Sequence, residues 1–389
     1  MENVSSSNGL EKYPKLRFPG FDEPYRSAQL GNIASLINRT DPKSNAPIMM
    51  LSAGNGFIMQ SEKYSRDNAG QSLKKYILLK QGELAYNHGA SKAKQFGCCY
   101  ELTEPEARIP YVYHCFKIND HEYTPYVAMT LNNPKMDKQL KRLVSSSVRM
   151  DGLLNISFED YMSVTLHLPP FNEQKRIADF LQKIDERIAA QEKLLAFLKK
   201  YKRGAIAYIL SGKGKEFAAE ATWSVKTLAD LCCEFRSGRN ISASLIHETG
   251  DYPVYGGNGI RGYCDQYSHA GEYVVVGRQG ALCGNVRLIH GQNYLSEHAI
   301  AVRANEENET RFLLYLLDYM KLGQYSDQGA QPGLAVNKLL RLKCAVPDKE
   351  TQSKIAQFLM SYDMQISTQE KMLSLLISQR RAFFQQLFI

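Results

Sequence analysis

The sequence contains no run of about 18 apolar residues, no C-x-x-C pair and no apolar stretch in its opening MENVSSSNGL. A membrane-spanning helix, a zinc ribbon and a secretory signal peptide are therefore not expected. The eight cysteines are scattered, and their two adjacent pairs are too closely spaced for a metal clip. Reduced, mostly buried thiols in a cytoplasmic protein are the expectation.

Sequence motifs of catalysis are also scarce. There is no Walker A phosphate loop, no H-E-x-x-H pair, and no ligand-like spacing among the eight histidines. Gly257–Gly262 matches G-x-G-x-x-G, but GYCDQYSHAGEYVVV follows from Gly262, which indicates a turn and a strand. A dinucleotide site needs a helix there, whose N-terminus binds the pyrophosphate. We therefore expect no catalysis by this chain alone, no metal ion and no cofactor.

Length and charge set broader bounds. With 389 residues, the chain can form two or more domains with full-sized cores. Its 48 Lys+Arg against 40 Asp+Glu give a net charge of +8. This mild excess favours an anionic partner such as DNA or RNA, with an inert basic surface as an equal alternative.

One segment occurs twice. QKRIADFLQKIDERIAAQEKLLAFL at 174–198 and QSKIAQFLMSYDMQISTQEKMLSLL at 352–376 align at a fixed offset of 178 positions. So many identities at one offset indicate an internal duplication. The identical pairs are Pro169/Pro347, Gln174/Gln352, Ile177/Ile355, Ala178/Ala356, Phe180/Phe358, Leu181/Leu359, Asp185/Asp363, Ile188/Ile366, Gln191/Gln369, Glu192/Glu370, Lys193/Lys371, Leu195/Leu373, Leu198/Leu376 and Arg203/Arg381.

Both copies have the apolar spacing of a helix, and the helices are predicted within 169–212 and 347–389. The first would run for about 38 residues, or ~57 Å. Such a long helix with a narrow apolar stripe needs a partner, and the other copy is the obvious candidate. The stripes that we expect to meet in a coiled-coil-like seam contain Ile177, Leu181, Ile184, Ile188, Leu195 and Leu198, and Ile355, Leu359, Ile366, Leu373 and Leu376.

A glutamine interrupts each stripe at the same place, Gln191 and Gln369. In an antiparallel pair the middles of the two helices meet, and a polar residue in the seam would set their register. A solvated position at the edge of the seam is an equal alternative.

The remaining sequence predicts an N-terminal tail at 1–17 and two mixed α/β globules at 18–168 and 213–346, since these regions hold Gly, Tyr, Asn and short β-type runs. Each globule ends in a strand that runs into proline. Strands are expected at Tyr126–Thr130, Tyr273–Val276 and Ala299–Val302, and short helices at Ile33–Leu36 and Phe312–Met320. The expected fold class is α+β, with two globules separated by two long antiparallel helices in a pseudo-two-fold repeat.

Polar, glycine-containing loops in both globules carry side chains suited to nucleic acid. Arginine reads guanine, Asn and Gln read adenine, and Lys and Tyr suit phosphates. Ordinary polar turns are the alternative for any single stretch. The candidate DNA-binding residues are Asn55, Tyr64, Arg66, Tyr86, Asn87, Ser91, Lys92 and Lys94 in the first globule, and Tyr255, Asn258, Arg261, Arg278, Gln279 and Asn285 in the second.

The chain resembles the specificity (S) subunit of type I DNA restriction–modification systems over nearly its whole length. The resemblance rests on LPPFNEQKRIADFLQKIDERI at 168–188 with VPDKETQSKIAQFLMSYDMQI at 346–366, on PKLRFPGF at 14–21, and on LKKYILLKQGELAYNHGASK at 73–92. YPVYGGNGIRGY and VVVGRQGALCGNV add to it in the second globule. The second helix begins KETQ where the first has FNEQ, so its Glu-Gln pair is lost. This difference puts in doubt that partner subunits would dock on the two helices with equal affinity.

The resemblance implies that the globules are target-recognition domains, each reading half of a split double-stranded DNA site. It also implies that the antiparallel helices set the spacing and dock two methyltransferase (M) subunits, and that restriction (R) subunits bind this assembly. N6-adenine methylation and ATP-dependent cleavage would belong to those partners, with S-adenosylmethionine, ATP and Mg. The alternatives are a helical scaffold that binds only proteins and a stand-alone hydrolase or transferase.

Overall fold

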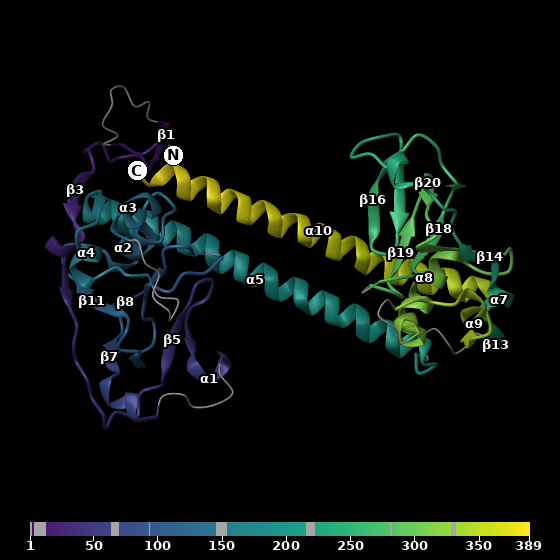
Figure 1. Ribbon diagram of the computed structural model, residues 1–389, viewed down its shortest axis with the longest axis horizontal. Coiled ribbons are helices and arrows are strands. Elements are labelled where there is room, and N and C mark those ends of the chain that lie inside the picture. Colours follow the sequence, from purple (N-terminus) through teal and green to yellow (C-terminus); the bar gives the residue numbers. More distant parts are fainter. Residues whose placement is uncertain are drawn as a thin grey trace. The chain divides into compact units, whose positions relative to one another are not determined.

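The computed structural model (Figure 1) contains two compact units, Met1–Ala189 with Ser374–Ile389, and Ala190–Leu373, called unit 1 and unit 2 below. Each unit contains one α/β globule and one end of each long helix. The structure describes residues 2–3, 13–63, 70–92, 94–144, 154–214, 222–280, 282–327 and 332–389.

Unit 1 is built on a four-stranded antiparallel sheet, β4-β11-β8-β9, formed by Ala34–Leu36, His114–Ile118, Leu84–Asn87 and Cys98–Glu101. Short strand pairs accompany it: β1–β2 (Glu2–Asn3, Leu16–Arg17), β5–β6 (Met49–Ser52, Gly56–Met59) and β7–β10 (Ile77–Lys80, Glu106–Ile109). Its helices are η1 (Leu30–Asn32), α1 (Gln60–Lys63), η2 (Gly70–Lys75), α2 (Thr124–Leu131), α3 (Asp137–Leu143) and α4 (Phe158–Met162).

Two secondary-structure predictions in unit 1 are wrong. The expected strand at Tyr126–Thr130 is helix α2, which has a proline in its first turn. Its apolar residues face the core, where the fully buried Tyr126 ring stacks on Phe388 at 5.0 Å between centroids. A helix is expected at Ile33–Leu36, but Ala34–Leu36 form strand β4, because pairing with β11 overrides the local preference.

Unit 2 contains two four-stranded sheets. The first, β14-β21-β18-β19, is antiparallel and consists of Cys232–Ser237, Ala299–Ala304, Tyr273–Gly277 and Val286–Ile289. The second, β16-β15-β20-β17, consists of Gly259–Cys264, Tyr252–Gly256, Gln292–Leu295 and His269–Ala270, and its β15 and β20 are parallel. The helices are α7 (Leu228–Leu231), η3 (Ala243–Leu245), α8 (Thr310–Tyr319), η4 (Leu322–Tyr325) and α9 (Val336–Leu340). The predictions of strands β18 and β21 and of helix α8 are confirmed.

Each globule is closed by a pair of strands from its two ends. In unit 1, β3 (Arg26–Gln29) pairs antiparallel with β12 (Thr165–Leu168), and in unit 2, β13 (Ser224–Thr227) pairs with β22 (Lys343–Val346). Both β12 and β22 run into proline, as predicted, and a long helix follows. The globule is thus fastened beside the start of its helix.

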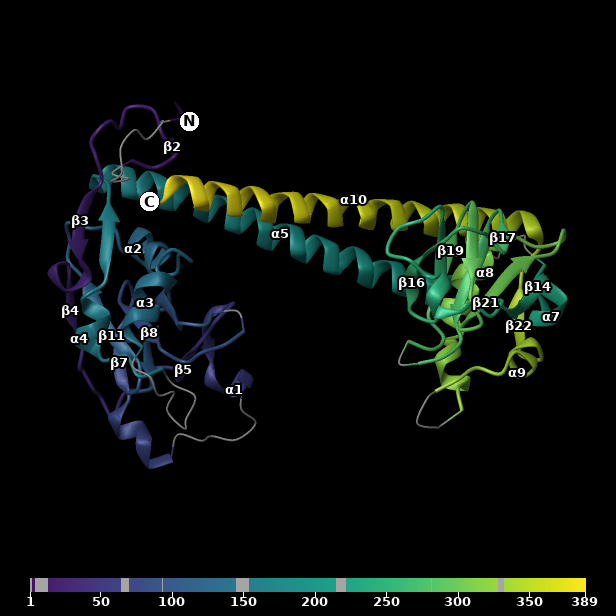
Figure 2. The ribbon, with the colours of Figure 1, turned by 45° about the horizontal axis from the view of Figure 1, so that its top comes forward.

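The long helices are α5 (Phe171–Leu210) and α10 (Lys349–Leu387), which lie side by side and antiparallel within each unit (Figures 1 and 2). In unit 2 the Gln191 Nε2–H donates to Gln369 Oε1 at 2.6 Å. The prediction that these two glutamines face each other is therefore confirmed. In unit 1, Arg380 binds the Asp185 carboxylate through two hydrogen bonds of 2.8 and 3.0 Å.

Burial along α5 and α10 follows the predicted seam. The predicted seam residues are all buried or half-buried. Together with the half-buried Gln191 in α5, and with Tyr362 and Gln369 in α10, they recur at alternating intervals of four and three residues, which is the heptad pattern of a coiled coil. The first turns of both helices also contribute to the globules, which the sequence did not predict. Ile177 and Leu181 belong to the core of the first globule, and Ile355 and Leu359 to that of the second. Each helix start is thus part of a globule.

Candidate nucleic-acid interface

In unit 2, a hairpin and two loops meet at one edge of the globule. The β15–β16 hairpin turns at Gly257-Asn258, and β18 ends at Gly277 beside it. A Cβ on Gly257 would lie 2.6 Å from the Gln279 carbonyl oxygen and 3.2 Å from that of His298. The hairpin, the loop after β18 and the segment after β20 are therefore packed against one another.

Two arginine side chains flank this hairpin. A Cβ on Gly256 would lie 2.5 Å from Arg261 Cδ, and one on Gly259 would lie 2.6 Å from Arg287 Nη1. Gly256 and Gly259 are partners across the hairpin, so the two arginines lie against opposite ends of one turn. The G-x-G-x-x-G match at 257–262 thus serves a tight strand–turn–strand, and no helix follows it.

The loop after β18 presents one half-buried and one exposed side chain, Arg278 and Gln279. The half-buried Arg278 donates to the carbonyl oxygens of Leu334 at 3.4 Å and Glu297 at 3.3 Å. Gln279 is exposed, and its Oε1 lies 2.5 Å from His298 Nδ1. Asn258 and Asn285 are exposed in their turns, and Tyr255 is half-buried against the core.

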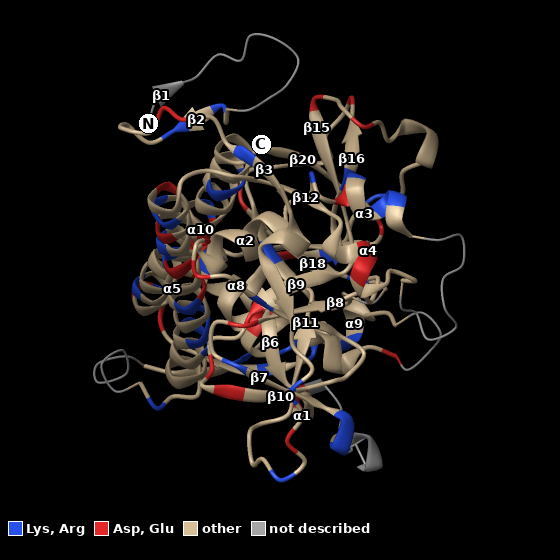
Figure 3. Cartoon of the chain, turned by 90° about the vertical axis from the view of Figure 1, so that its left-hand side faces the viewer, with Lys and Arg blue, Asp and Glu red and all other residues tan. Residues whose placement is uncertain are grey.

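The charges of the second globule balance overall. Residues 213–346 contain as many Asp and Glu as Lys and Arg, so a net excess does not favour DNA here. However, β21 begins beside the arginine-flanked hairpin and ends at the acidic segment Glu306–Glu309, ~20 Å further on at 3.3 Å per residue. On the long helices, by contrast, blue and red residues alternate (Figure 3). Two exposed arginines at the hairpin, rather than a net excess of positive charge, favour an anionic ligand at this edge.

In unit 1, the predicted residues surround the end of strand β8. Asn87 Oδ1 accepts from the Gly89 N–H at 2.9 Å, and Lys94 Nζ donates to the Asn132 carbonyl oxygen at 2.7 Å. Burial lowers the pKa of Lys94. Ser91 and Lys92 are exposed, as is Asn55 at the β5–β6 turn. These exposed side chains can contact a ligand directly, whereas Asn87 and Lys94 hold the loop.

One candidate in unit 1 is corrected. Tyr86 is 1% exposed, stacks on Tyr161 at 3.7 Å between ring centroids, and donates its hydroxyl to the Phe96 carbonyl oxygen at 2.6 Å. Because the side chain is enclosed in the core, the prediction that it contacts DNA is wrong. The candidates Tyr64 and Arg66 lie outside the described residues.

The structure brings forward three residues that the sequence analysis did not select. Arg287 lies on the regular strand β19, Arg239 follows β14 and pairs with Ser296, and His298 contacts Gln279. Arg287 directly follows VVVGRQGALCGNV in the sequence, but only the fold places it beside Gly259. Within the described parts of the chain, no group of three His, Cys, Asp or Glu could hold a metal ion, and no helix is long and apolar enough to cross a membrane.

These features define a duplicated protein, in which two globules with exposed polar loops are each fastened to a shared helix pair. The sequence matches the type I restriction modification DNA specificity domain twice, at residues 37–200 and 220–376. The chain belongs to this family, whose specificity subunits are generally non-catalytic.

Relatives agree with this assignment over parts of their length. The chain is 46% identical over 142 residues to the EcoprrI type I restriction enzyme specificity subunit of Escherichia coli, covering 36% of this chain and 35% of that protein. It is 31% identical over 157 residues to a putative type I specificity subunit of Mycoplasma pneumoniae, covering 39% and 41%. The matched stretch thus spans well under two thirds of either relative.

Solved structures share the fold. The crystal structure of a type I restriction–modification S subunit from M. genitalium aligns over 97% of this chain and 99% of its own, with a TM-score of 0.66 and 17% identity. A second structure, from a study of complex assembly and conformational transition of the type I R-M system, aligns over 96% and 99% with a TM-score of 0.53 and 16% identity. The α+β fold with two globules and long antiparallel helices is therefore confirmed.

Proposed function

We propose that this chain is the DNA-reading subunit of a type I restriction–modification complex and recognises a bipartite site. Residues 18–168 read one half-site, and residues 213–346 read the other. The spacer helices at 169–212 and 347–389 dock two methyltransferase subunits, and restriction subunits bind the resulting assembly. Methylation of adenine and ATP-dependent cleavage take place on those partners.

The observation that carries the proposal is the hairpin edge of unit 2. Arg239, Arg261 and Arg287 are exposed, and no carboxylate of the described residues lies within ion-pair distance of any of them. Other arginines of the same globule are neutralised, as Arg236 is by Glu234 at 2.7 Å and Arg311 by Glu272 at 2.8 Å. Unneutralised guanidinium groups beside exposed amides suit both phosphates and base edges.

The proposed docking of two copies of one partner rests on the helices. At equivalent positions of the repeat, Leu194 is 43% and Met372 is 40% exposed, while Phe197 is 61% and Leu375 is 54% exposed. Large apolar side chains outside the seam have no role in pairing α5 with α10. Their recurrence at the repeat offset supports one kind of partner binding twice.

Methylome sequencing tests the proposal. Cells that express this chain with its methyltransferase subunit should gain N6-methyladenine in one split motif, and cells that lack this chain should not. Exchange of residues 18–167 for the corresponding globule of a related chain should change one half of that motif only. Absence of any motif, or a change in both halves, would count against this division of labour and favour a scaffold that binds only proteins.

A further inference from the structure

The hairpin edge of unit 2 contains arginines in two different states, and this difference divides their roles. The half-buried Arg278 uses two of its N–H donors within the protein, for the carbonyl oxygens of Leu334 and Glu297. The guanidinium groups of Arg261 and Arg287 are exposed, and no described residue accepts a hydrogen bond from them. A guanidinium has five N–H donors, so these two side chains keep theirs for a ligand.

We propose that Arg287, together with Arg261 and Asn258, reads base edges in the half-site bound by unit 2, and that Arg278 is a positioning residue. This inference rests on the proposed function. It reverses the sequence-based expectation, which selected Arg278 as a guanine-reading residue and did not select Arg287.

Geometry prepares Arg287 for such a contact. Its backbone belongs to β19, where it pairs with Val275 in a regular ladder, so its Cα is held by the sheet. Its Nη1, Cζ and Nη2 lie 2.6, 3.1 and 3.2 Å from the position of a Cβ on Gly259, so the planar group lies across the hairpin turn. A side chain at residue 259 would displace the guanidinium. The glycine, whose φ is +108°, thus serves both the turn and the arginine.

The shape of this edge also suits a groove of DNA. A two-stranded β-ribbon fits the major groove, and an arginine there can donate two parallel hydrogen bonds to guanine O6 and N7. In the β15–β16 hairpin, Asn258 is at the tip, Arg261 packs against Gly256, and Arg287 packs against Gly259. Three base-reading side chains therefore surround one turn, and the Gly257 contacts with the neighbouring loops support it from behind.

Selection from a randomised 30-base-pair duplex library tests the division of roles, with the full chain in complex with its methyltransferase subunit. Arg287→Ala and Arg287→Gln should each remove the preference at one base position of one half-site. Affinity for the wild-type motif should fall about 5- to 150-fold. Arg278→Ala should weaken binding to all selected sequences by a similar factor and leave the preferred bases unchanged.

The matched control is Arg236→Ala. Arg236 is also exposed and lies on β14, the other edge strand of the same sheet, but is neutralised by Glu234. This variant should retain both affinity and preferred bases. Thermal unfolding of each variant checks that the globule remains folded.

The outcomes separate this inference from the proposed function. If Arg287→Ala and Arg287→Gln keep every base preference, or weaken all sequences equally, the base-reading role of Arg287 is refuted. Loss of a base preference on Arg278→Ala would restore the sequence-based assignment. If the wild-type complex itself selects no motif, the proposed function fails instead.

Discussion

In unit 1, the start of helix α5 is held by a glutamine that makes three hydrogen bonds. Gln174 Oε1 accepts from the Tyr123 N–H at 2.9 Å, and Gln174 Nε2 donates to the Pro169 carbonyl oxygen at 2.9 Å and to Glu122 Oε2 at 2.6 Å. The glutamine is 1% exposed. It joins the globule to the helix through groups that would otherwise be buried without partners.

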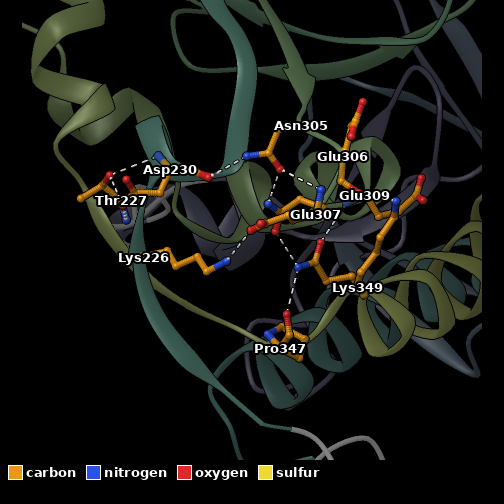
Figure 4. Close-up of polar contacts among 11 residues, drawn as sticks. Lys226, Thr227, Asp230, Asn305, Glu306, Glu307, Glu309, Pro347 and Lys349 are labelled. Carbon is orange, nitrogen blue, oxygen red and sulfur yellow. Dashed lines mark hydrogen bonds and ion pairs between the residues drawn. The ribbon is translucent and has the colours of Figure 1, made fainter.

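Unit 2 repeats this arrangement at the start of α10. Gln352, also 1% exposed, accepts from the Glu309 N–H at 3.0 Å and donates to the Pro347 carbonyl oxygen at 2.9 Å and to Asn308 Oδ1 at 2.9 Å. Figure 4 shows the polar contacts around Pro347 and Glu309. Two globules with different strands and loops therefore use the same connection to their helices.

The units differ at the residue before the glutamine. In unit 1 the fully buried Glu173 accepts two hydrogen bonds of 2.8 and 2.7 Å from Arg17, which is 3% exposed. In unit 2 the equivalent Thr351 donates its backbone N–H and its hydroxyl to the Asp348 carboxylate at 3.0 and 3.1 Å. The ion pair fastens the leading segment 14–21, whose sequence PKLRFPGF is not repeated before the second globule.

The difference between FNEQ and KETQ therefore does not indicate unequal docking of a partner protein. The glutamine is retained in both, and Glu173 is 0% exposed, so it cannot belong to a docking surface for another protein. The repeat thus retains the glutamine that joins each globule to its helix, Gln174 in unit 1 and Gln352 in unit 2. The changed residue, Glu173, serves the contact with Arg17, and the described part of unit 2 shows no equivalent ion pair at Thr351.

Among substitutions that test this difference between the units, Glu173→Ala should cause the largest loss of stability. It leaves the Arg17 charge buried without a partner, so the free energy of unfolding of unit 1 should fall by about 3–5 kcal/mol. Thr351→Val removes one hydroxyl contact and should cost unit 2 less than about 1.5 kcal/mol. Differential scanning calorimetry of the full chain measures both.

A double variant serves as the control for this prediction. Arg17→Met with Glu173→Leu removes both charges and should recover most of the lost stability, because similar-sized apolar side chains often replace a buried ion pair without loss. Equal melting temperatures for Glu173→Ala and Thr351→Val would show that the ion pair does not distinguish the units.

The two glutamines should show matched losses. Gln174→Ala and Gln352→Ala each leave a buried N–H and a buried carbonyl oxygen unpaired, which should cost about 1–3 kcal/mol in the unit concerned. Gln174→Glu and Gln352→Glu are informative companions, since a carboxylate keeps the acceptor but loses both donors. Chemical denaturation with probes in each unit measures the losses. A cost in one unit only would contradict the view that the two connections are equivalent.

A smaller effect concerns pH and unit 1. Burial lowers the pKa of His114, whose Nε2 lies 3.0 Å from the Ile156 carbonyl oxygen. Below about pH 6.5 the unfolded chain therefore binds a proton that the folded histidine resists, so stability should decrease as the pH falls. His114→Gln keeps a donor and removes the titration, so its melting temperature should fall less between pH 7 and pH 5.

The exposed His121 provides the control for this prediction. His121→Gln should leave the pH dependence of the melting temperature close to that of the wild type. If His114→Gln and the wild type lose stability in parallel between pH 7 and pH 5, His114 is not the group responsible.

The smallest expected change in stability comes from Gln191→Leu combined with Gln369→Leu. Removal of both partners of one hydrogen bond is nearly neutral or slightly stabilising, because no donor or acceptor is left unpaired. The single variants should be less stable than the double variant, since each of them leaves one glutamine amide without its hydrogen-bond partner. A double-mutant cycle by thermal unfolding measures this coupling. Additive effects of the two substitutions would indicate that the glutamines act separately, as solvated edge residues would.

Some features of the fold could be predicted because they depend on periodicity. The stripe containing Leu181 and Leu359 repeats over many turns, so it identified both helices, their starts near Pro169 and Pro347, and their antiparallel contact. Short elements were less secure. The Tyr126–Thr130 run is apolar and β-branched enough to suggest a strand, yet a proline in the first turn and packing against the core make it helix α2.

Candidate site residues were harder to predict than the fold. Residue type and neighbouring glycines selected Asn258 and Arg261 at the hairpin, which the structure leaves exposed. The same criteria selected Tyr86, which is buried, and Arg278, which already donates to two carbonyl oxygens of the protein. Sequence shows which side chains could bind a ligand. It does not show which of them the protein already uses for its own hydrogen bonds.

The duplication, the two long helices and the family could be inferred from the sequence alone, because each of them rests on a pattern of residues along the chain. Which of the candidate side chains remain available to a ligand depends on the tertiary structure. Arg287 lies 28 positions after Gly259 and reaches it because β19 and the β15–β16 hairpin are brought together by their sheets. Glu173 meets Arg17 across 156 positions in the same way. Contacts between distant positions depend on how the core packs, and no local pattern records them.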